Sequence, residues 1–301
     1  MTTLPQAGAA PSSAELGGRI DATLQEFLGS AERELCASDP SASPLIEEIR
    51  RLLGAGGKRL RPAFCYWGFR ATGRPDGEPI VRASAALELL HTMALVHDDV
   101  MDEASERRGV PSTHVHLEAV LAGVPDPTAR RHAAISAAII VGDLAVVLAD
   151  RLFLEAGFEP AVTIDALSSY HRMRMATAAG QFLDVAMTVA GDPAAVRRAA
   201  VLKGGAYTVE GPLEIGAALA GANDRQRDAL RRFGAPLSAA FQLRDDLVDG
   251  EGAHGATPGQ VNALVREALD ALDALEAPAS AELDPGAAHA LRALAHRLEM
   301  P

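Results

Sequence analysis

Residues 85–102 read AALELLHTMALVHDDVMD, an apolar run that ends in Asp98, Asp99 and Asp102. A second acidic cluster, DDLVD at residues 245–249, also follows an apolar run and repeats the pattern DDxxD. Apolar residues that recur every three or four positions predict α-helices. On a helix, the first and last Asp of each cluster lie four residues apart and share one face. The two runs therefore predict two helices that carry carboxylates at their C-terminal ends.

Carboxylates gathered in this way need a compensating charge. They repel one another, and the helix dipole disfavours anions at a C-terminal end, so a capping role fails. A single cluster would be read as a solvated helix face or an N-terminal cap, but the repetition favours metal binding. Magnesium is normally held by one or two carboxylates together with substrate phosphates. We therefore predict that Mg²⁺ and a diphosphate are bound by two facing clusters, formed by Asp98, Asp99, Asp102, Asp245, Asp246 and Asp249.

Lysine is rare in this chain. Only Lys58 and Lys203 are lysines among the 28 basic residues. A lysine retained in such a chain indicates a site that needs a compact positive charge, as phosphate groups often do. Lys58 lies in GGKRLRP at residues 56–62, where Lys58 and Arg61 are three positions apart and can converge on one anion. A solvated basic surface is the alternative, and the adjoining Gly pair and the apolar residues 64–67 weaken it.

Further basic residues surround the first cluster. His91 precedes Asp98 by seven residues, nearly two turns, so both point the same way. Arg107 and Arg108 follow the cluster and, as consecutive residues, diverge toward two different anions. His97 is expected to pack or to form a hydrogen bond rather than to bind metal. The pair His114 and His116 is interpreted as a surface loop.

Composition predicts an all-α fold. Strand patterns are nearly absent, and long helices are expected to surround a central cavity in one helical domain over residues 15–301. Residues 1–14 lack periodicity and are expected to be a disordered tail without the features of a signal peptide. The apolar run at residues 133–149 is interpreted as a buried helix at a subunit contact, too short for a membrane span. A net charge of −12 argues against nucleic acid, and two cysteines are consistent with the reducing cytoplasm.

Five ordered segments resemble the trans-isoprenyl diphosphate synthase, or polyprenyl synthetase, family. They are GGKRLRP, HTMALVHDDVMDEASERRG, GQFLD, LKGGAYTVEGPLEIGAALAG and FQLRDDLVD, and the resemblance runs from about residue 40 to residue 249. It implies a homodimeric, Mg²⁺-dependent prenyltransferase with an isoprenoid synthase type of helical bundle, not integral to the membrane. About three Mg²⁺ ions would bind to the six Asp residues and an allylic diphosphate.

The resemblance also assigns the remaining polar residues. Arg107 and Lys203 would contact the allylic diphosphate. The pocket for isopentenyl diphosphate would be formed by Lys58, Arg61, His91 and Arg108. Gln181, Asp184 and Gln242 would line the central cavity.

The chain departs from the family pattern at two places. After Asp249 the family continues through a lysine-bearing segment, whereas residues 250–260 contain neither Lys nor Arg. Turnover is therefore expected to be slow, or to depend on an unusual acceptor or a partner subunit. Gly204 also stands where the family commonly has Thr.

Three functions remain open at this point. The first is chain elongation, in which the allylic diphosphate ionises and the double bond of isopentenyl diphosphate attacks the cation in a dry pocket. The second is a class I terpene cyclase or atypical prenyltransferase, and the third is a noncatalytic subunit that modulates a partner synthase. Lys58, Arg61 and His91 favour elongation over cyclisation. In the resembling family, residues before the first Asp cluster limit the product, so Met93 and Ala94 predict geranylgeranyl diphosphate, with three isoprene units as the next expectation.

Overall fold

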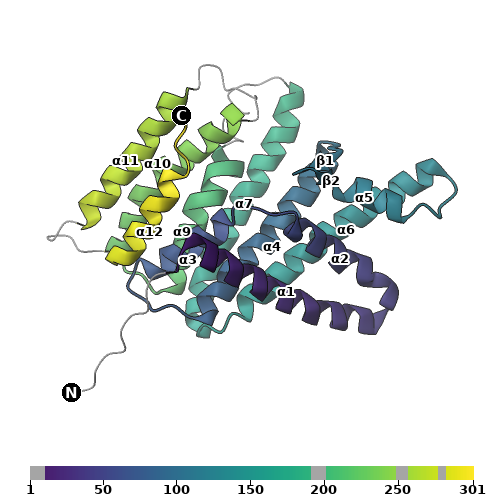
Figure 1. Cartoon of the computed structure of the whole chain (residues 1–301), viewed down its shortest axis with the longest axis horizontal. Helices are drawn as coiled ribbons and strands as arrows, with labels where there is room; N and C mark the ends of the chain where they lie inside the picture. Colours follow the sequence, from purple (N-terminus) through teal and green to yellow (C-terminus); the bar gives the residue numbers. More distant parts are fainter. Residues whose placement is uncertain (1–10, 191–200, 249–256, 277–282) are drawn as a thin grey trace. The chain divides into compact units, whose positions relative to one another are not determined.

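The computed structural model describes residues 11–190, 201–248, 257–276 and 283–301 (Figure 1). The described chain is helical apart from one small hairpin, as the sequence predicts. The helices are α1 (Ser13–Ser38), η1 (Pro40–Ala42), α2 (Ser43–Gly54), α3 (Leu60–Arg70), α4 (Glu78–Met101), α5 (Thr113–Val120), α6 (Pro127–Leu154), α7 (Pro160–Ala190), η2 (Val201–Glu210), α9 (Gly211–Leu219), α10 (Asp224–Val248), α11 (Pro258–Glu276) and α12 (Pro285–His296). The strands are β1 (Glu106–Arg107) and β2 (Val110–Pro111).

Local sequence signals set several helix ends. Asp126 precedes Pro127 and accepts hydrogen bonds from the backbone amides of Thr128 and Ala129, both at 3.2 Å, so α6 begins there. Asp284 caps α12 in the same way before Pro285. Helix α1 begins at Ser13, two residues inside the tail that the sequence predicts, and residues 1–10 lie outside the described part.

The chain forms two compact units. The N-terminal unit consists of residues 17–59 and 81–156, and the C-terminal unit consists of residues 11–16, 60–80 and the described part of 157–301. The expectation of one domain over residues 15–301 stays a prediction.

The N-terminal unit holds the first Asp cluster. Its helix α4 is buried along most of its apolar residues, and Ala85, Leu87 and Leu89 are at most 1% exposed. Helix α6 contacts α2 and α5. Burial of the apolar residues of α4 against their neighbours stabilises the helix on which the cluster stands.

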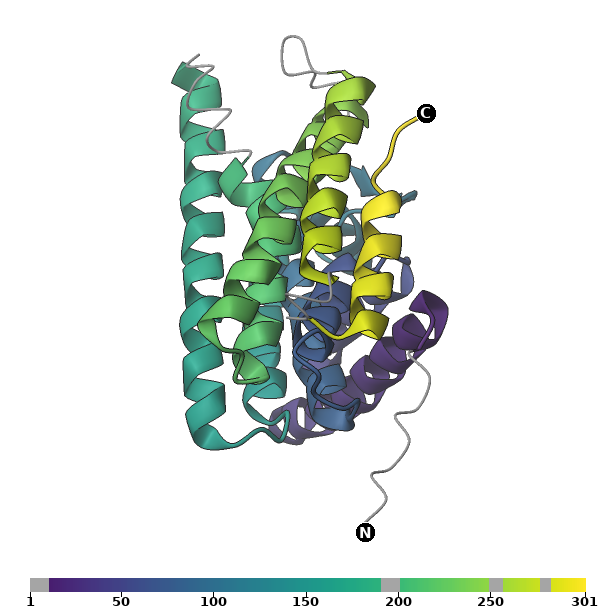
Figure 2. The ribbon, with the colours of Figure 1, turned by 90° about the vertical axis from the view of Figure 1, so that its left-hand side faces the viewer.

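The C-terminal unit holds the second cluster on α10. Helices α10 and α11 lie alongside each other in Figures 1 and 2, and α10 also contacts η2 and α9. Helix α3 packs against α9 and η2. The π-helical geometry of η2 is rare, and such segments occur frequently at functional sites.

Two of the described helices, α4 and α6, are long and apolar enough to cross a membrane by length and composition alone. In the most apolar window of α4, 67% of the residues are buried, whereas in that of α6 the share is 39%. Helix α6 has 28 residues and extends beyond the apolar run at residues 133–149, so the expectation of a segment too short for a span does not hold for the whole helix. A buried core helix passes the same test, and α4 fits that description.

Candidate active site

The first Asp cluster lies at the C-terminal end of α4. Asp98 and Asp99 belong to the last helical turn, and Asp102 follows the helix end with its backbone amide donating to the carbonyl of Asp98 at 2.9 Å. Asp99 is 1% exposed, whereas Asp102 is exposed. Burial raises the pKa of the Asp99 carboxyl, although the neighbouring Arg107 guanidinium acts in the opposite direction. The prediction that the first Asp cluster lies at the C-terminal end of a helix is confirmed by the position of Asp98 and Asp99 in α4.

A tight hairpin presents the two consecutive arginines. Strands β1 and β2 pair antiparallel, with Arg107 opposite Val110. The two residues between them, Arg108 and Gly109, have φ values of +54° and +75°, as a type I′ turn requires. The left-handed backbone costs about 1–2 kcal/mol for a residue with a side chain such as Arg108. Strain of this kind is found where a side chain must be held in one place.

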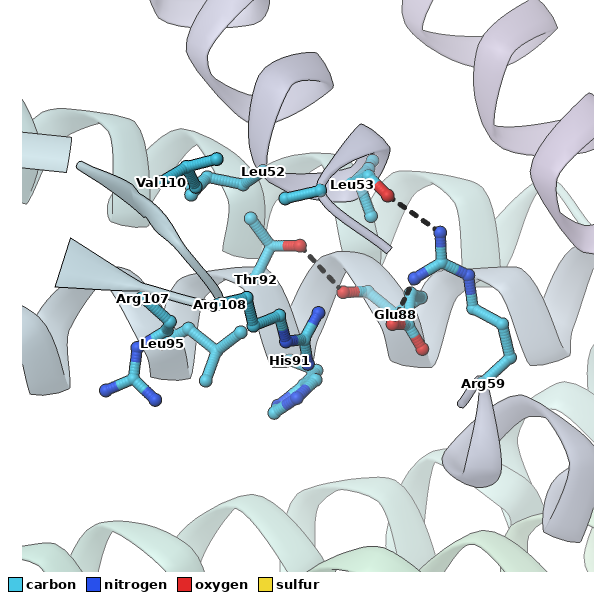
Figure 3. Close-up of a pocket in the computed structure, with 11 residues that line it drawn as sticks. Leu52, Leu53, Arg59, Glu88, His91, Thr92, Leu95, Arg107, Arg108 and Val110 are labelled. Carbon is cyan, nitrogen blue, oxygen red and sulfur yellow. Dashed lines mark hydrogen bonds and ion pairs between the residues drawn. The ribbon is translucent and has the colours of Figure 1, made fainter. Parts of the chain in front are cut away.

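Arg107 and Arg108 leave the hairpin in opposite directions, as Figure 3 shows. Arg107 donates from Nε to Asp99 at 2.6 Å and from Nη2 to Asp98 at 3.2 Å. Arg108 donates to the backbone carbonyl oxygen of Gly56, in the loop that carries Lys58. The expected divergence of the two guanidiniums is confirmed, and it arises from the turn.

A pocket of the N-terminal unit lies between α2, α4 and the hairpin (Figure 3). Its basic lining residues are Arg59, His91, Arg107 and Arg108. Nearby apolar walls come from Leu52, Leu53 and Leu95. The pocket therefore combines basic side chains with apolar surface, and the carboxylate of Glu88 also lines it.

Lys58 is exposed in the loop before α3, and its helical relation to Arg61 is not present. The helix begins only at Leu60, and Arg59 has a left-handed φ of +48°. Lys58 therefore precedes the helix that carries Arg61, and the expectation that the two cations converge on one anion stays a prediction. Arg61 lies in the C-terminal unit, where it donates to Thr208 at 2.8 Å and its guanidinium carbon is 4.6 Å from the Tyr207 ring centroid.

Sequence reasoning missed the residues that hold this pocket together. Arg59 donates to buried Glu88 at 2.9 Å and to the carbonyl of Leu53 at 2.8 Å, as the dashed lines of Figure 3 show. Glu88 is a lone acidic residue within the apolar run of α4. That isolation was a usable signal, because carboxylates are rarely buried unless they are paired.

A second buried carboxylate supports the hairpin. Glu48, 1% exposed, accepts hydrogen bonds from Arg51 at 2.8 Å, and its Oε2 lies 2.7 Å from Nδ1 of His116. Arg51 also donates to the carbonyl of Pro111 in β2 at 2.9 Å. The interpretation of His114 and His116 as a surface loop is wrong, because both lie on α5 and His114 is buried.

His97 packs against α6, as expected. Its Nε2 lies 3.2 Å from the carbonyl oxygen of Ile139 and 3.8 Å from Asp143. A Cβ on Gly142 would lie only 2.1 Å from the same nitrogen, so the ring occupies the space above a residue without a side chain. Met93 and Ala94, one to two turns before Asp98 on α4, are both partly buried.

The C-terminal unit brings together the other predicted residues. Lys203 on η2 donates to Asp184 on α7 at 2.8 Å. Gln242 donates to Asp246 at 2.6 Å on α10, where Asp245 is exposed. Gln181 is partly buried on α7. Asp249 and the lysine-free residues 250–256 lie outside the described residues.

The residues of the first cluster fit a magnesium ion that takes further ligands from elsewhere. Carboxylate oxygens are the hard ligands that Mg²⁺ prefers. Asp98 is 20% exposed, and the buried Oδ2 of Asp99 has no hydrogen-bond partner in the described structure. Within the described ranges, no three His, Cys, Asp or Glu side chains are placed to hold a metal ion by themselves. Diphosphate oxygens and water would complete such a site.

Comparison with known proteins gives a consistent result. A family model described as polyprenyl synthetase matches residues 43–259. The chain is 29% identical over 243 residues to nonaprenyl diphosphate synthase of Mycobacterium tuberculosis, an alignment that covers 77% of this chain and 63% of the relative. It is 32% identical over 210 residues to geranylgeranyl diphosphate synthase of Sulfolobus acidocaldarius, covering 68% of this chain and 58% of the relative. The match thus spans about three fifths of these two curated relatives.

Solved structures share the fold. Geranylgeranyl pyrophosphate synthase from Corynebacterium glutamicum, complexed with isoprenyl diphosphate and magnesium, matches with a TM-score of 0.85 at 23% identity and covers 96% of this chain and 99% of that one. An FPP/GFPP synthase from Zymomonas mobilis matches with a TM-score of 0.71 at 26% identity, covering 95% and 99%. These likenesses confirm the all-α isoprenoid synthase fold that the sequence predicts.

Proposed function

Because the chain belongs to the polyprenyl synthetase family, we propose that it is a Mg²⁺-dependent prenyltransferase that condenses isopentenyl diphosphate with an allylic diphosphate. The divergence of Arg107 and Arg108 supports this proposal most directly. One guanidinium is directed to the first Asp cluster and the next to the Lys58 loop. Two neighbouring cations can thereby serve two separate diphosphates, and elongation requires two whereas cyclisation requires one.

The allylic diphosphate is assigned to the residues around the two Asp clusters. Six carboxylates would hold about three Mg²⁺ ions, from Asp98, Asp99, Asp102, Asp245, Asp246 and Asp249. Magnesium, when bound, would neutralise charge on the leaving diphosphate. Arg107 and Lys203 would donate hydrogen bonds to the same leaving group, exchanging their present carboxylate partners for its oxygens.

Isopentenyl diphosphate is assigned to Lys58, Arg61, His91 and Arg108. The apolar residues that line the pocket with His91 and Arg108 would exclude water while the double bond attacks the allylic cation. A proton is then lost, and the released diphosphate is the proposed acceptor. Gln181, Asp184 and Gln242 would line the cavity for the hydrocarbon chain. The chain therefore needs no side-chain nucleophile.

The proposed product is geranylgeranyl diphosphate. Met93 is of medium size and flexible, and Ala94 is small, so a cavity limited by them admits a medium chain. Relatives of this chain make products of different lengths by name, including nonaprenyl and geranylgeranyl diphosphates. The proposal on product length therefore rests on the residues of α4 and not on membership of the family.

We further propose a homodimer formed by α6 in the cytoplasm. Ile140, Val147 and Leu154 are 52%, 60% and 55% exposed and follow one another at intervals of seven residues. This spacing places the three exposed apolar side chains on one face of the helix, and a second copy of the chain can cover them by two-fold symmetry. Val147→Glu should shift the mass measured by light scattering from dimer to monomer, whereas an unchanged mass would contradict this interface.

Product analysis tests the proposed activity. Purified protein would be incubated with Mg²⁺, labelled isopentenyl diphosphate and, in turn, dimethylallyl, geranyl and farnesyl diphosphate. Labelled prenyl diphosphates are expected. Hydrocarbon or alcohol formed from the allylic substrate alone would indicate a cyclase, and absence of any product would favour a noncatalytic subunit.

Asp98→Ala and Asp245→Ala serve as the matched negative variants. Each should reduce kcat by a factor of about 10³ or more, since carboxylates that hold Mg²⁺ act on the departing charge. Asp228→Ala is the control, because Asp228 forms only a surface pair with Arg231 on the same helix as Asp245. Unchanged turnover in either negative variant would contradict the roles of the two clusters.

A further inference from the structure

Gly204 and Gly205 bring η2 into direct contact with α10. A Cβ on Gly204 would lie 1.5 Å from Oε1 of Gln242, so the carboxamide of Gln242 occupies the space of the missing side chain. A Cβ on Gly205 would lie 2.1 Å from the carbonyl oxygen of Ser238, whose hydroxyl donates to the Gly205 carbonyl at 3.1 Å. Any side chain at residue 204 would exclude the observed position of Gln242.

In this position, the side chain of Gln242 contacts the second Asp cluster. Ser238, Gln242 and Asp246 are spaced by four residues and share one face of α10. From its place over Gly204, Gln242 donates from Nε2 to Oδ1 of Asp246 at 2.6 Å. A hydrogen bond from an amide to a carboxylate is among the stronger ones, and it restrains the carboxylate in one orientation.

The orientation of the amide is itself informative. Oε1 of Gln242 is buried and has no hydrogen-bond partner in the described part of the chain. A buried polar atom without a partner is costly, so the arrangement is not explained by stability alone. The amide keeps Nε2 toward Asp246, because the opposite orientation would place two oxygens against each other.

We propose that Gly204 is a positioning residue that acts through Gln242. The absence of a side chain at residue 204 seats the amide of Gln242, and the amide in turn fixes the Asp246 carboxylate of the second cluster. Gly204 and Gln242 thus form one functional pair in this chain. The consequence for metal binding rests on the proposed function, whereas the coupling of the two residues does not.

The coupling is tested by a double-mutant cycle. Gly204→Ala, Gln242→Ala and the double variant would be compared for binding of Mn²⁺ together with inorganic diphosphate by calorimetry. Each single variant should weaken binding about tenfold, as removal of an outer partner of a metal ligand typically does. The double variant should bind as Gln242→Ala does, because alanine at residue 204 displaces nothing once Gln242 is shortened. If the double variant instead loses binding by the product of the two single losses, the proposal is overturned.

A second readout is independent of metal and of turnover. In protein labelled with ¹⁵N-glutamine, the side-chain amide signals of Gln242 are identified by their loss in Gln242→Ala. Gly204→Ala should shift these signals toward those of solvent-exposed glutamines. An unchanged spectrum would overturn the proposal, and a shift without any Mn²⁺ binding by the unmodified protein would leave the pair intact while contradicting the metal site.

Two controls separate positioning from misfolding. Gly18→Ala adds the same methyl group at an exposed position of α1, where an added Cβ would have nothing within 4 Å, and should change neither readout. If Gly204→Ala does not fold, the double variant should fold, because it has room for the methyl group. Failure of both variants to fold would show that Gly204 serves packing rather than Gln242.

Discussion

Arg59 and Glu88 form an ion pair of 2.9 Å that fastens the Lys58 loop to α4. Arg59 has a left-handed φ of +48°, and its guanidinium also donates to the carbonyl of Leu53 and to Asp21. The side chains are 11% and 5% exposed. A pair so little exposed to water leaves a buried charge behind when one partner is removed.

Arg59→Ala should therefore lower the free energy of unfolding by about 3–5 kcal/mol, as for other broken buried pairs. It should also raise the KM for isopentenyl diphosphate, because Lys58 loses its anchored neighbour. Urea denaturation followed by circular dichroism measures the first effect. Glu88→Gln should recover part of the loss in the double variant, and Arg33→Ala on exposed α1 should change stability by less than about 0.5 kcal/mol. Equal effects of Arg33→Ala and Arg59→Ala would contradict the role of the pair.

The two lysines should affect different substrates. Lys58→Ala should raise the KM for isopentenyl diphosphate, and Lys203→Ala that for the allylic diphosphate, each by about tenfold or more, with little change in the other. Lys203 pairs with Asp184 at 2.8 Å, but their side chains are 31% and 36% exposed, so the pair contributes little to stability. Steady-state kinetics with each substrate varied in turn gives the answer. The assignment fails if both variants change both constants equally.

Product length should depend on Met93. The residue lies about 7.5 Å along the axis of α4 from Asp98, at about 1.5 Å per residue. Met93→Phe should shift the main product by one isoprene unit or more to a shorter chain, and Met93→Ala should lengthen it. Val120→Phe on α5, where Val120 is 54% exposed, is the control without an expected effect. An unchanged product distribution in both Met93 variants would place the floor of the cavity elsewhere, with Leu90 as the next position to test.

Glu210 gives stability a pH dependence. Burial raises the pKa of its carboxyl from the ordinary value of 4.5, and the nearby Glu214 acts in the same direction. The folded state therefore binds more protons than the unfolded state above pH 4.5, and this contribution to stability is lost as pH rises through the folded pKa. Glu210→Gln should raise the melting temperature at pH 7 and leave it nearly unchanged at pH 4. A uniform shift at both pH values would show that charge is not the cause.

The sequence predicted the helices better than it predicted the loops. The apolar run of α4 and the Asp cluster at its end follow directly from helical periodicity, and the structure has both. Lys58 and Arg61 are three positions apart in the sequence, yet α3 begins between them. Arg59, between them, has a left-handed backbone and pairs with Glu88, which lies in a distant part of the sequence and which no pattern around residue 59 indicates.

The directions of Arg107 and Arg108 show the same limit. That consecutive side chains diverge is a local rule, and it held. That Arg108 occupies a left-handed turn position could not be predicted, because glycine or asparagine is preferred there. His114 is likewise buried on α5, although no pattern within α5 indicates this.

The scarcity of lysine makes the chain suited to chemical footprinting. Lys58 is exposed in its loop, and Lys203 retains 31% exposure beside Asp184. An acylating reagent that modifies primary amines would find these two side chains and the amino terminus, because the sequence contains no other lysine. Mass spectrometry of two peptides would then report separately on each of the two proposed substrate pockets, without a reporter group or any engineered label.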